Sequence, residues 1–159
     1  MPERWLGVVV TGERVTLVDA EIPDDGGKII TIVADNVLKL QNGDRALAYA
    51  AIARQIRDYA KENSIKKCVM KASAVPLRGP ATLSLLQSAE LRGVVCCALA
   101  DIAPVETTTK SRISKTFGSR KADEYLADNK FWEESVTGAD LKSGSREAAL
   151  VILAARGDD

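Results

Sequence analysis

The sequence predicts an α/β domain in which a mixed β-sheet is flanked by helices. Three observations lead to this fold class: an opening series of β-branched runs separated by turn residues, helical spacing of apolar residues from residue 44 onward, and later strand patterns that alternate with helical ones. An antiparallel series followed by strand–helix units is typical of a mixed sheet covered by helices. A length of 159 residues with 46% hydrophobic residues suits a single domain spanning residues 1–159.

The opening 34 residues are expected to form an antiparallel meander. A β-branched run covers Trp5–Val10, and the residues Thr11–Arg14 then carry a turn pattern. A second strand is expected over Val15–Ile22 and a third over Lys28–Ala34, with the turn Pro23–Gly27 between them. Short turns join neighbouring strands, so these three strands are expected to pair in sequence order.

The remainder of the chain alternates between helical and extended patterns. Apolar residues recur every three or four positions from Asp44 to Asn63, which predicts a helix with one buried face. The continuous apolar run Gly93–Ile102 fits a helix and a strand equally well, so periodicity leaves both open. The other expected elements are strands over Lys66–Ala72 and Val105–Thr109 and helices over Ala81–Arg92, Ser119–Trp132 and Ser145–Arg156.

Residue types exclude several kinds of site. The chain has no histidine, which removes Ser–His and Cys–His nucleophile pairs and His-containing zinc sites. Its cysteines, Cys68, Cys96 and Cys97, are too few for a four-cysteine site and are expected to be buried thiols. The 22 basic and 22 acidic residues balance, so any affinity for nucleic acid must come from a local patch. With no long apolar run or signal-peptide pattern, we expect a cytoplasmic protein without a membrane partner.

Three segments resemble RuvC-type Holliday-junction resolvases. Leu86–Val95 resembles the family's helix with a Gly-Gln-Ala-Arg-Gly-Val-like motif, and Pro104–Asp123 resembles its strand and basic connection. Leu6–Gly12 is similar to the family's first strand, Leu-Gly-Ile-Asp-x-Gly, with one extra residue before the glycine. The resemblance implies an RNase H-like fold with a five-stranded sheet, an antiparallel meander plus two parallel strands. It also implies that one long helix runs from Ala81 to about Asp101.

The resemblance further implies where a catalytic centre would lie, and there this sequence departs from the family. RuvC-type enzymes hold two magnesium ions with an Asp in the first strand, a Glu in the fourth and one or two Asp at the start of the last helix. In this chain Val9 and Lys71 match the first two positions, and only Glu147, beside Arg146, falls near the third. Val9, Lys71 and Glu147 are together termed the vestigial site. We expect no catalytic residue, metal or cofactor there.

Two outcomes are open for Lys71. Its ammonium group either occupies the vacated metal space and pairs with Glu147, or it reaches solvent at a strand end. The first outcome would hold the site together without an ion.

A basic segment follows the fifth expected strand. Five cations lie between Glu106 and residue 121, interspersed with Ser and Thr hydroxyls that suit phosphate contacts. A solvated loop has the same composition, so both interpretations stay open. The cations of this basic segment are Lys110, Arg112, Lys115, Arg120 and Lys121.

The leading functional hypothesis is a catalytically degenerate RuvC-like domain that binds branched or duplex DNA through the basic segment. By family analogy we expect a homodimer. The first alternative is a protein-interaction or scaffold module with the same fold. The second is an active metal-dependent nuclease that uses relocated acids such as Asp19, Asp101 or Glu147.

Overall fold

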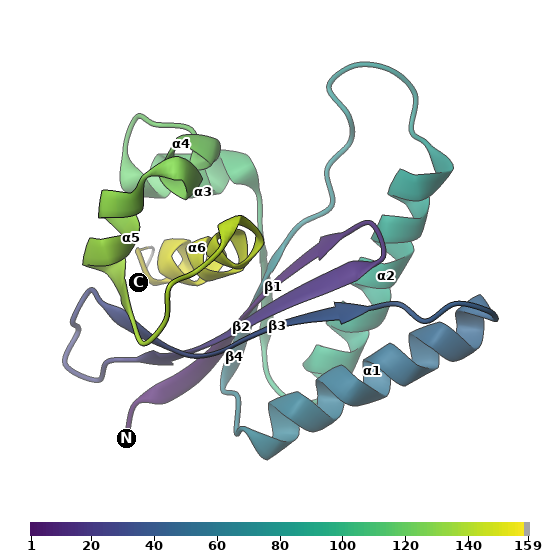
Figure 1. Cartoon of the computed structure of the whole chain (residues 1–159), viewed down its shortest axis with the longest axis horizontal. Coiled ribbons are helices and arrows are strands. Elements are labelled where there is room, and N and C mark those ends of the chain that lie inside the picture. The colour runs from purple at the N-terminus through teal and green to yellow at the C-terminus, as the bar shows by residue number, and fades with distance from the viewer. Residues whose placement is uncertain (158–159) are drawn as a thin grey trace.

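The computed structural model describes residues 1–157 and contains one mixed sheet with helices on both faces (Figure 1). The strands are β1 (Glu3–Thr11), β2 (Arg14–Ile22), β3 (Ile30–Lys39), β4 (Lys67–Lys71), β5 (Val105–Thr108) and β6 (Val136–Thr137). The helices are α1 (Arg45–Glu62), α2 (Leu83–Ala100), α3 (Lys110–Phe117), α4 (Ala122–Ala127), α5 (Asn129–Ser135) and α6 (Ser143–Gly157).

The strand order is β5-β4-β1-β2-β3-β6. The antiparallel β1–β2–β3 meander and the parallel pairing of β4 and β5 next to β1 confirm the expected mixed sheet. The expected count of five strands is one too low, because β6 adds a two-residue parallel pairing with Ile30 and Thr31. A strand of two residues is too short to show any alternation. The third strand also runs five residues past its expected end at Ala34. The sequence did not predict this extension, because the second half of the strand is largely exposed and has no regular apolar alternation.

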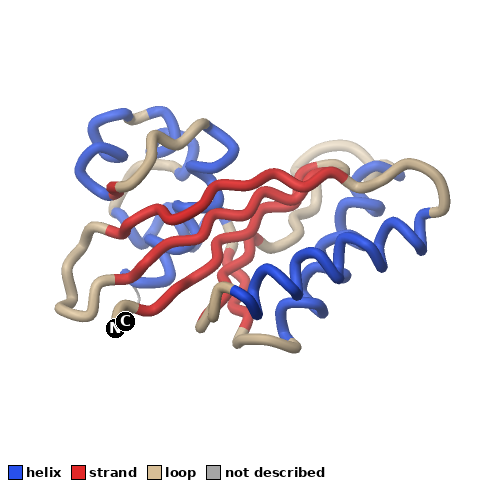
Figure 2. Tube along the Cα trace, turned by 60° about the horizontal axis from the view of Figure 1, so that its bottom comes forward, coloured by secondary structure: helices blue, strands red, loops and turns tan. Residues whose placement is uncertain are grey.

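Different sets of helices cover the two faces of the sheet (Figure 2). The pair α1 and α2 packs on one face, and its core includes Leu6, Val8 and Met70 from the strands. On the other face α6 lies on β1, β2 and β4, with α3 and α4 packed against it. The core on that side includes Val9 and Val69, so consecutive strand residues alternate between the two layers.

The ambiguous apolar run is helical. The α2 helix continues without a break to Ala100, and the Thr82 hydroxyl accepts a hydrogen bond from the Leu85 N–H at its start, 3.2 Å. Among the described residues, α2 is the one helix long and apolar enough to cross a bilayer by length and composition. Its buried residues pack against α1 and the sheet as part of the core.

Two local expectations are wrong, and one helix had not been expected. The helix expected over Ser119–Trp132 is two short helices, because Asp128 adopts an extended backbone and its carboxylate caps α5 by accepting from the Phe131 N–H. The basic connection contains the helix α3. Of the thiols expected to be buried, Cys68 is buried, Cys96 is half-buried and Cys97 is exposed, because Cys97 lies on the outer face of α2.

Candidate functional site

The vestigial site lies where β1 and β4 end. The parallel register of these strands pairs Val8 with Met70, so Val9 and Lys71 are the next residues on adjacent strands. The Val9 side chain is 3% exposed and packs in the core beneath α6. It fills its space with aliphatic carbon and offers no ligand atom.

Lys71 and Glu147 form an ion pair between β4 and α6. The ammonium group donates to Glu147 Oε1, and both side chains are a little over three-quarters buried. This contact confirms the expected pairing, and the solvent-directed lysine is the wrong alternative. Because both charges are largely removed from water, deleting one partner alone would leave the other poorly compensated.

Arg92 is a third charged residue at this place, and sequence reasoning missed it. From α2 its guanidinium reaches the end of β1, where Nη2 donates to the Val10 carbonyl at 2.9 Å and Nη1 to the Ser73 hydroxyl at 3.0 Å. Burial lowers the pKa of Arg92, and the nearby charge of Glu147 opposes that shift. The available signal was a cation directly before the apolar run of α2, because an arginine drawn into the core requires polar partners.

The acids of the nuclease alternative do not converge. Asp19 is 1% exposed and lies on the α1 side of the sheet, where it accepts two bonds from Arg4 and one from the Tyr59 hydroxyl at 2.7 Å. Asp101 follows the end of α2 and pairs with Arg57 at 3.3 Å, near the opposite end of the sheet. Within residues 1–157 no three Asp, Glu or Cys side chains gather as a metal-binding group. In the described part of the chain, Asp19, Asp101 and Glu147 therefore lie apart and do not share one site.

Acidic partners accompany three cations of the basic segment. Lys110 lies 3.1 Å from Asp123, Arg112 lies 3.8 Å from Glu106, and Arg120 lies 2.9 Å from Asp128. Asp123 and Asp128 come after the segment in sequence, so counting local charges did not include them.

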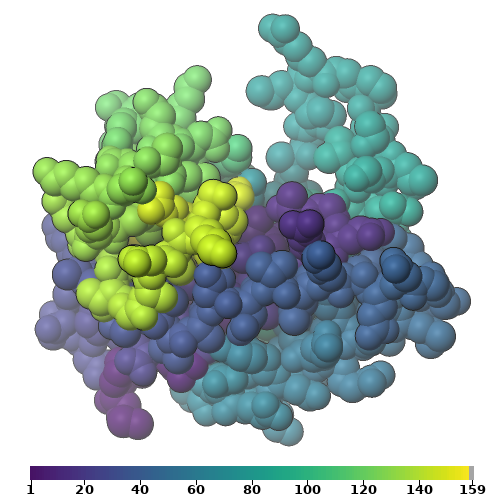
Figure 3. Space-filling model, in the orientation of Figure 1, coloured from purple at the N-terminus to yellow at the C-terminus, as the bar shows by residue number. Residues whose placement is uncertain are grey.

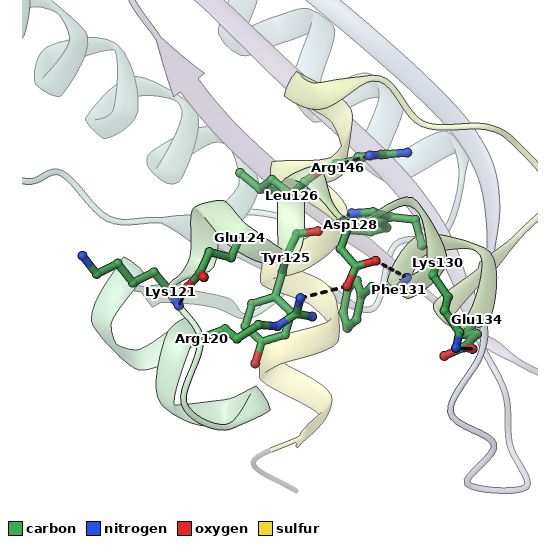
Figure 4. Close-up of polar contacts among 11 residues, drawn as sticks. Arg120, Lys121, Glu124, Tyr125, Leu126, Asp128, Lys130, Phe131, Glu134 and Arg146 are labelled. Carbon is green, nitrogen blue, oxygen red and sulfur yellow. Dashed lines mark hydrogen bonds and ion pairs between the residues drawn. The ribbon is translucent and has the colours of Figure 1, made fainter.

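A close-up shows how Arg120 is held (Figure 4). Its guanidinium points at the Asp128 carboxylate and also lies over the Tyr125 ring, 4.3 Å from the centroid. The pKa of Asp128 is lowered from its usual value, first by the hydrogen bond from Arg120 and then by the hydrogen bond from the Phe131 N–H. Lys115 and Lys121 are exposed and form no ion pair within the described residues. Within residues 1–157, Lys115 and Lys121 are thus the cations of the basic segment that no acid accompanies.

Comparisons with known proteins agree on the fold. No protein-family model and no curated protein matches the sequence. Thermus thermophilus RuvC superposes with a TM-score of 0.75 at 13% identity, over 95% of this chain and 92% of that chain. RuvC of the same organism in complex with a Holliday junction substrate gives 0.70 at 10% identity, over 96% and 91%. A yeast mitochondrial Holliday junction resolvase gives 0.62 at 12% identity, over 98% and 78%. The chain therefore has the RNase H-like fold of the RuvC-type Holliday-junction resolvases.

Proposed function

We propose that this protein is a catalytically degenerate RuvC-like domain that binds branched nucleic acid without cleaving it. The support for binding is the similarity of nearly the whole chain to RuvC, including RuvC in complex with a Holliday junction substrate. Because net charge is zero, binding is expected to be modest and to weaken with salt.

The main support for the proposed loss of cleavage is the Lys71–Glu147 ion pair. Two magnesium ions require several converging carboxylates, and the resemblance implies that those ligands would stand at the positions of Val9, Lys71 and Glu147. There the single carboxylate is already neutralised by a lysine, and the first position is the aliphatic Val9. The remaining negative charge is too small to draw two divalent cations together.

The experiment measures the affinity of the full chain for a four-way DNA junction and for a linear duplex. Each is tested at low and at physiological salt, with magnesium, and products are resolved on a gel. We expect junction binding that weakens with salt and intact strands after long incubation. Magnesium-dependent cleavage would overturn the loss of activity, and no binding at low salt would overturn the nucleic-acid role.

The basic segment is the proposed contact surface. Lys115 and Lys121 are exposed and free of ion pairs in the described chain, so changing both to Ala should weaken junction binding and flatten its salt dependence by about two counterions. Changing Lys110 and Arg112 to Ala should have a smaller effect, since both cations already face acids. Unchanged affinity in the Lys115 and Lys121 variant would remove this surface.

A protein-interaction role is the second candidate, and an exposed apolar arm favours it. This apolar arm comprises Val75, Leu77, Leu83 and Leu86, with side chains 56% to 102% exposed. We propose that a second copy of the chain covers it, giving the homodimer expected by family analogy. Sedimentation of the wild type against a Leu83→Glu/Leu86→Glu variant tests this, and a monomeric wild type would contradict it.

A further inference from the structure

We propose that Lys71 and Arg92 bind a backbone phosphate of the nucleic acid directly, and that Glu147 competes with this phosphate for Lys71. The inference rests on the proposed function and deepens it, because it names the group that the vestigial site takes up. In this proposal, two side-chain cations take the role that metal ions play in a nuclease of this fold.

The charges come from three elements that meet at one end of the sheet. Lys71 ends β4, Arg92 lies in the middle of α2, and Glu147 is in the first half of α6. Arg92 is fixed by its bonds to Val10 and Ser73, and the charge of Glu147 acts on it. The three side chains sum to one net positive charge, where metal binding would require a negative one.

The place is open to a large ligand. The space-filling view shows a hollow between the projecting segment around residues 75–86 and the lobe formed by α3 to α6 (Figure 3). The end of β1 forms part of the floor of this hollow (Figure 3). A nucleic-acid backbone lying in it would pass over the carboxyl ends of β1 and β4. The Lys71 side chain there is 23% exposed.

A phosphodiester suits this donor set. The ammonium group of Lys71 offers a compact charge, the planar guanidinium of Arg92 is fixed in orientation, and the Ser73 hydroxyl lies beside it. Charge-assisted bonds of this kind are about twice as strong as neutral ones. In the free protein the Glu147 carboxylate occupies Lys71 instead, so the phosphate must displace it.

The competition between Glu147 and the phosphate predicts in which direction the junction affinity changes when Glu147 is replaced. Removing the charge of Glu147 frees Lys71 for phosphate, so Glu147→Gln should bind a four-way junction about three- to tenfold more tightly. The slope of log affinity against log salt should steepen by about 0.9, the value for one additional phosphate contact. A Glu147 that served as a metal ligand for DNA binding would give the opposite sign.

The matched control is Glu62→Gln. Glu62 is an exposed carboxylate at the end of α1, near the start of β1 and β4, so its variant makes the same change in net charge at the other end of these strands. A gain in affinity for Glu147→Gln that exceeds the gain for Glu62→Gln supports the inference. Equal gains, or a loss for Glu147→Gln, overturn it.

A charge-neutral variant covers the case in which single substitutions unfold the chain. Lys71→Met/Glu147→Met replaces the ion pair by apolar side chains, which proteins often tolerate, and leaves net charge unchanged. Its junction affinity should fall about three- to tenfold, while its unfolding by urea stays cooperative. Unchanged affinity overturns the phosphate site and leaves the proposed function standing. A wild type that binds no DNA at low salt overturns both.

Discussion

Gly7 of β1 lies directly against the backbone of α6 at Ala148. A β-carbon at Gly7 would lie 1.9 Å from the Ala148 carbonyl oxygen and 3.0 Å from Ile152 Cγ1. Only a residue without a side chain permits this approach. The close crossing of α6 over β1 also positions the preceding residue, Glu147, to reach Lys71 on the neighbouring strand. The geometry of the vestigial site therefore depends on a glycine two residues before Val9.

Replacing Gly7 by Ala should push α6 away from the sheet. Overpacking of this kind typically costs about 1–3 kcal/mol, and the upper end is expected because the obstacle is backbone. Urea unfolding measures the loss. Gly93→Ala is the matched control, since a β-carbon there meets nothing within 4 Å and helix propensity favours alanine by about 0.5–1 kcal/mol. Equal stabilities for the two variants would contradict the close contact.

Introducing carboxylates at the vestigial site should create a metal centre. In a Val9→Asp/Lys71→Glu variant, two new acids join Glu147, and oxygen ligands at one place suit a hard divalent cation. Without metal, like charges should destabilise this variant relative to the wild type. Manganese should therefore raise its unfolding temperature and leave that of the wild type unchanged.

The control for this design is Lys71→Glu alone, in which Val9 still blocks the first ligand position. Its stabilisation by manganese should be smaller than that of the double variant. If manganese stabilises neither, the match of Val9 and Lys71 to the family's metal-binding positions is wrong.

Local patterns predicted the strands and helices with strong periodicity. The first strand is a β-branched run, the second alternates and α1 has helical spacing, and their bounds differ from expectation by at most two residues. The run Gly93–Ile102 is apolar at nearly every position, so no period could assign it, and the resemblance alone favoured the helix that is present. The break at Asp128 between α4 and α5 follows from a capping bond that competes with the helical pattern.

The site was also predicted only in part, because several of its contacts join residues that are far apart in the sequence. The resemblance assigns Lys71 and Glu147 to the same centre. Their opposite charges then predict that they pair. Arg92 was missed because its partners, Val10 and Ser73, lie 82 and 19 residues away and meet it only through tertiary packing. The acids opposite Lys110 and Arg120 were missed because the chain folds back through α4 and α5.

Thiol reactivity should separate the cysteines. Cys97 is exposed, whereas Cys68 is buried and its burial raises the pKa of the thiol to about 12. Because the thiolate is the reactive form, Cys97 should be modified quickly by a thiol reagent at neutral pH and Cys68 only on unfolding. Mass spectrometry of quenched samples reads each site. Rapid modification of Cys68 in the folded protein would contradict the packing of β4 beneath α2.

Alkaline pH should test the buried group around Asp19. Burial, followed by the hydrogen bond to Asp19, raises the pKa of Tyr59 above its ordinary value of 10.0. A raised pKa in the folded state means that the stabilisation is fully present below pH 10. It is lost as pH rises further, because the unfolded chain releases this proton first.

Tyr59→Phe isolates that contribution. The variant should be less stable than the wild type by about 1–2 kcal/mol at neutral pH, because Asp19 loses one donor while keeping Arg4. Urea unfolding from pH 7 to about pH 11 should show this difference shrinking above pH 10, since only the wild type carries the titrating hydroxyl at this position. A difference that stays constant across the range would mean that Tyr59 ionises at the same pH in the folded and unfolded chain. That result would contradict a hydroxyl whose proton is held in the folded chain by burial and by the bond to Asp19.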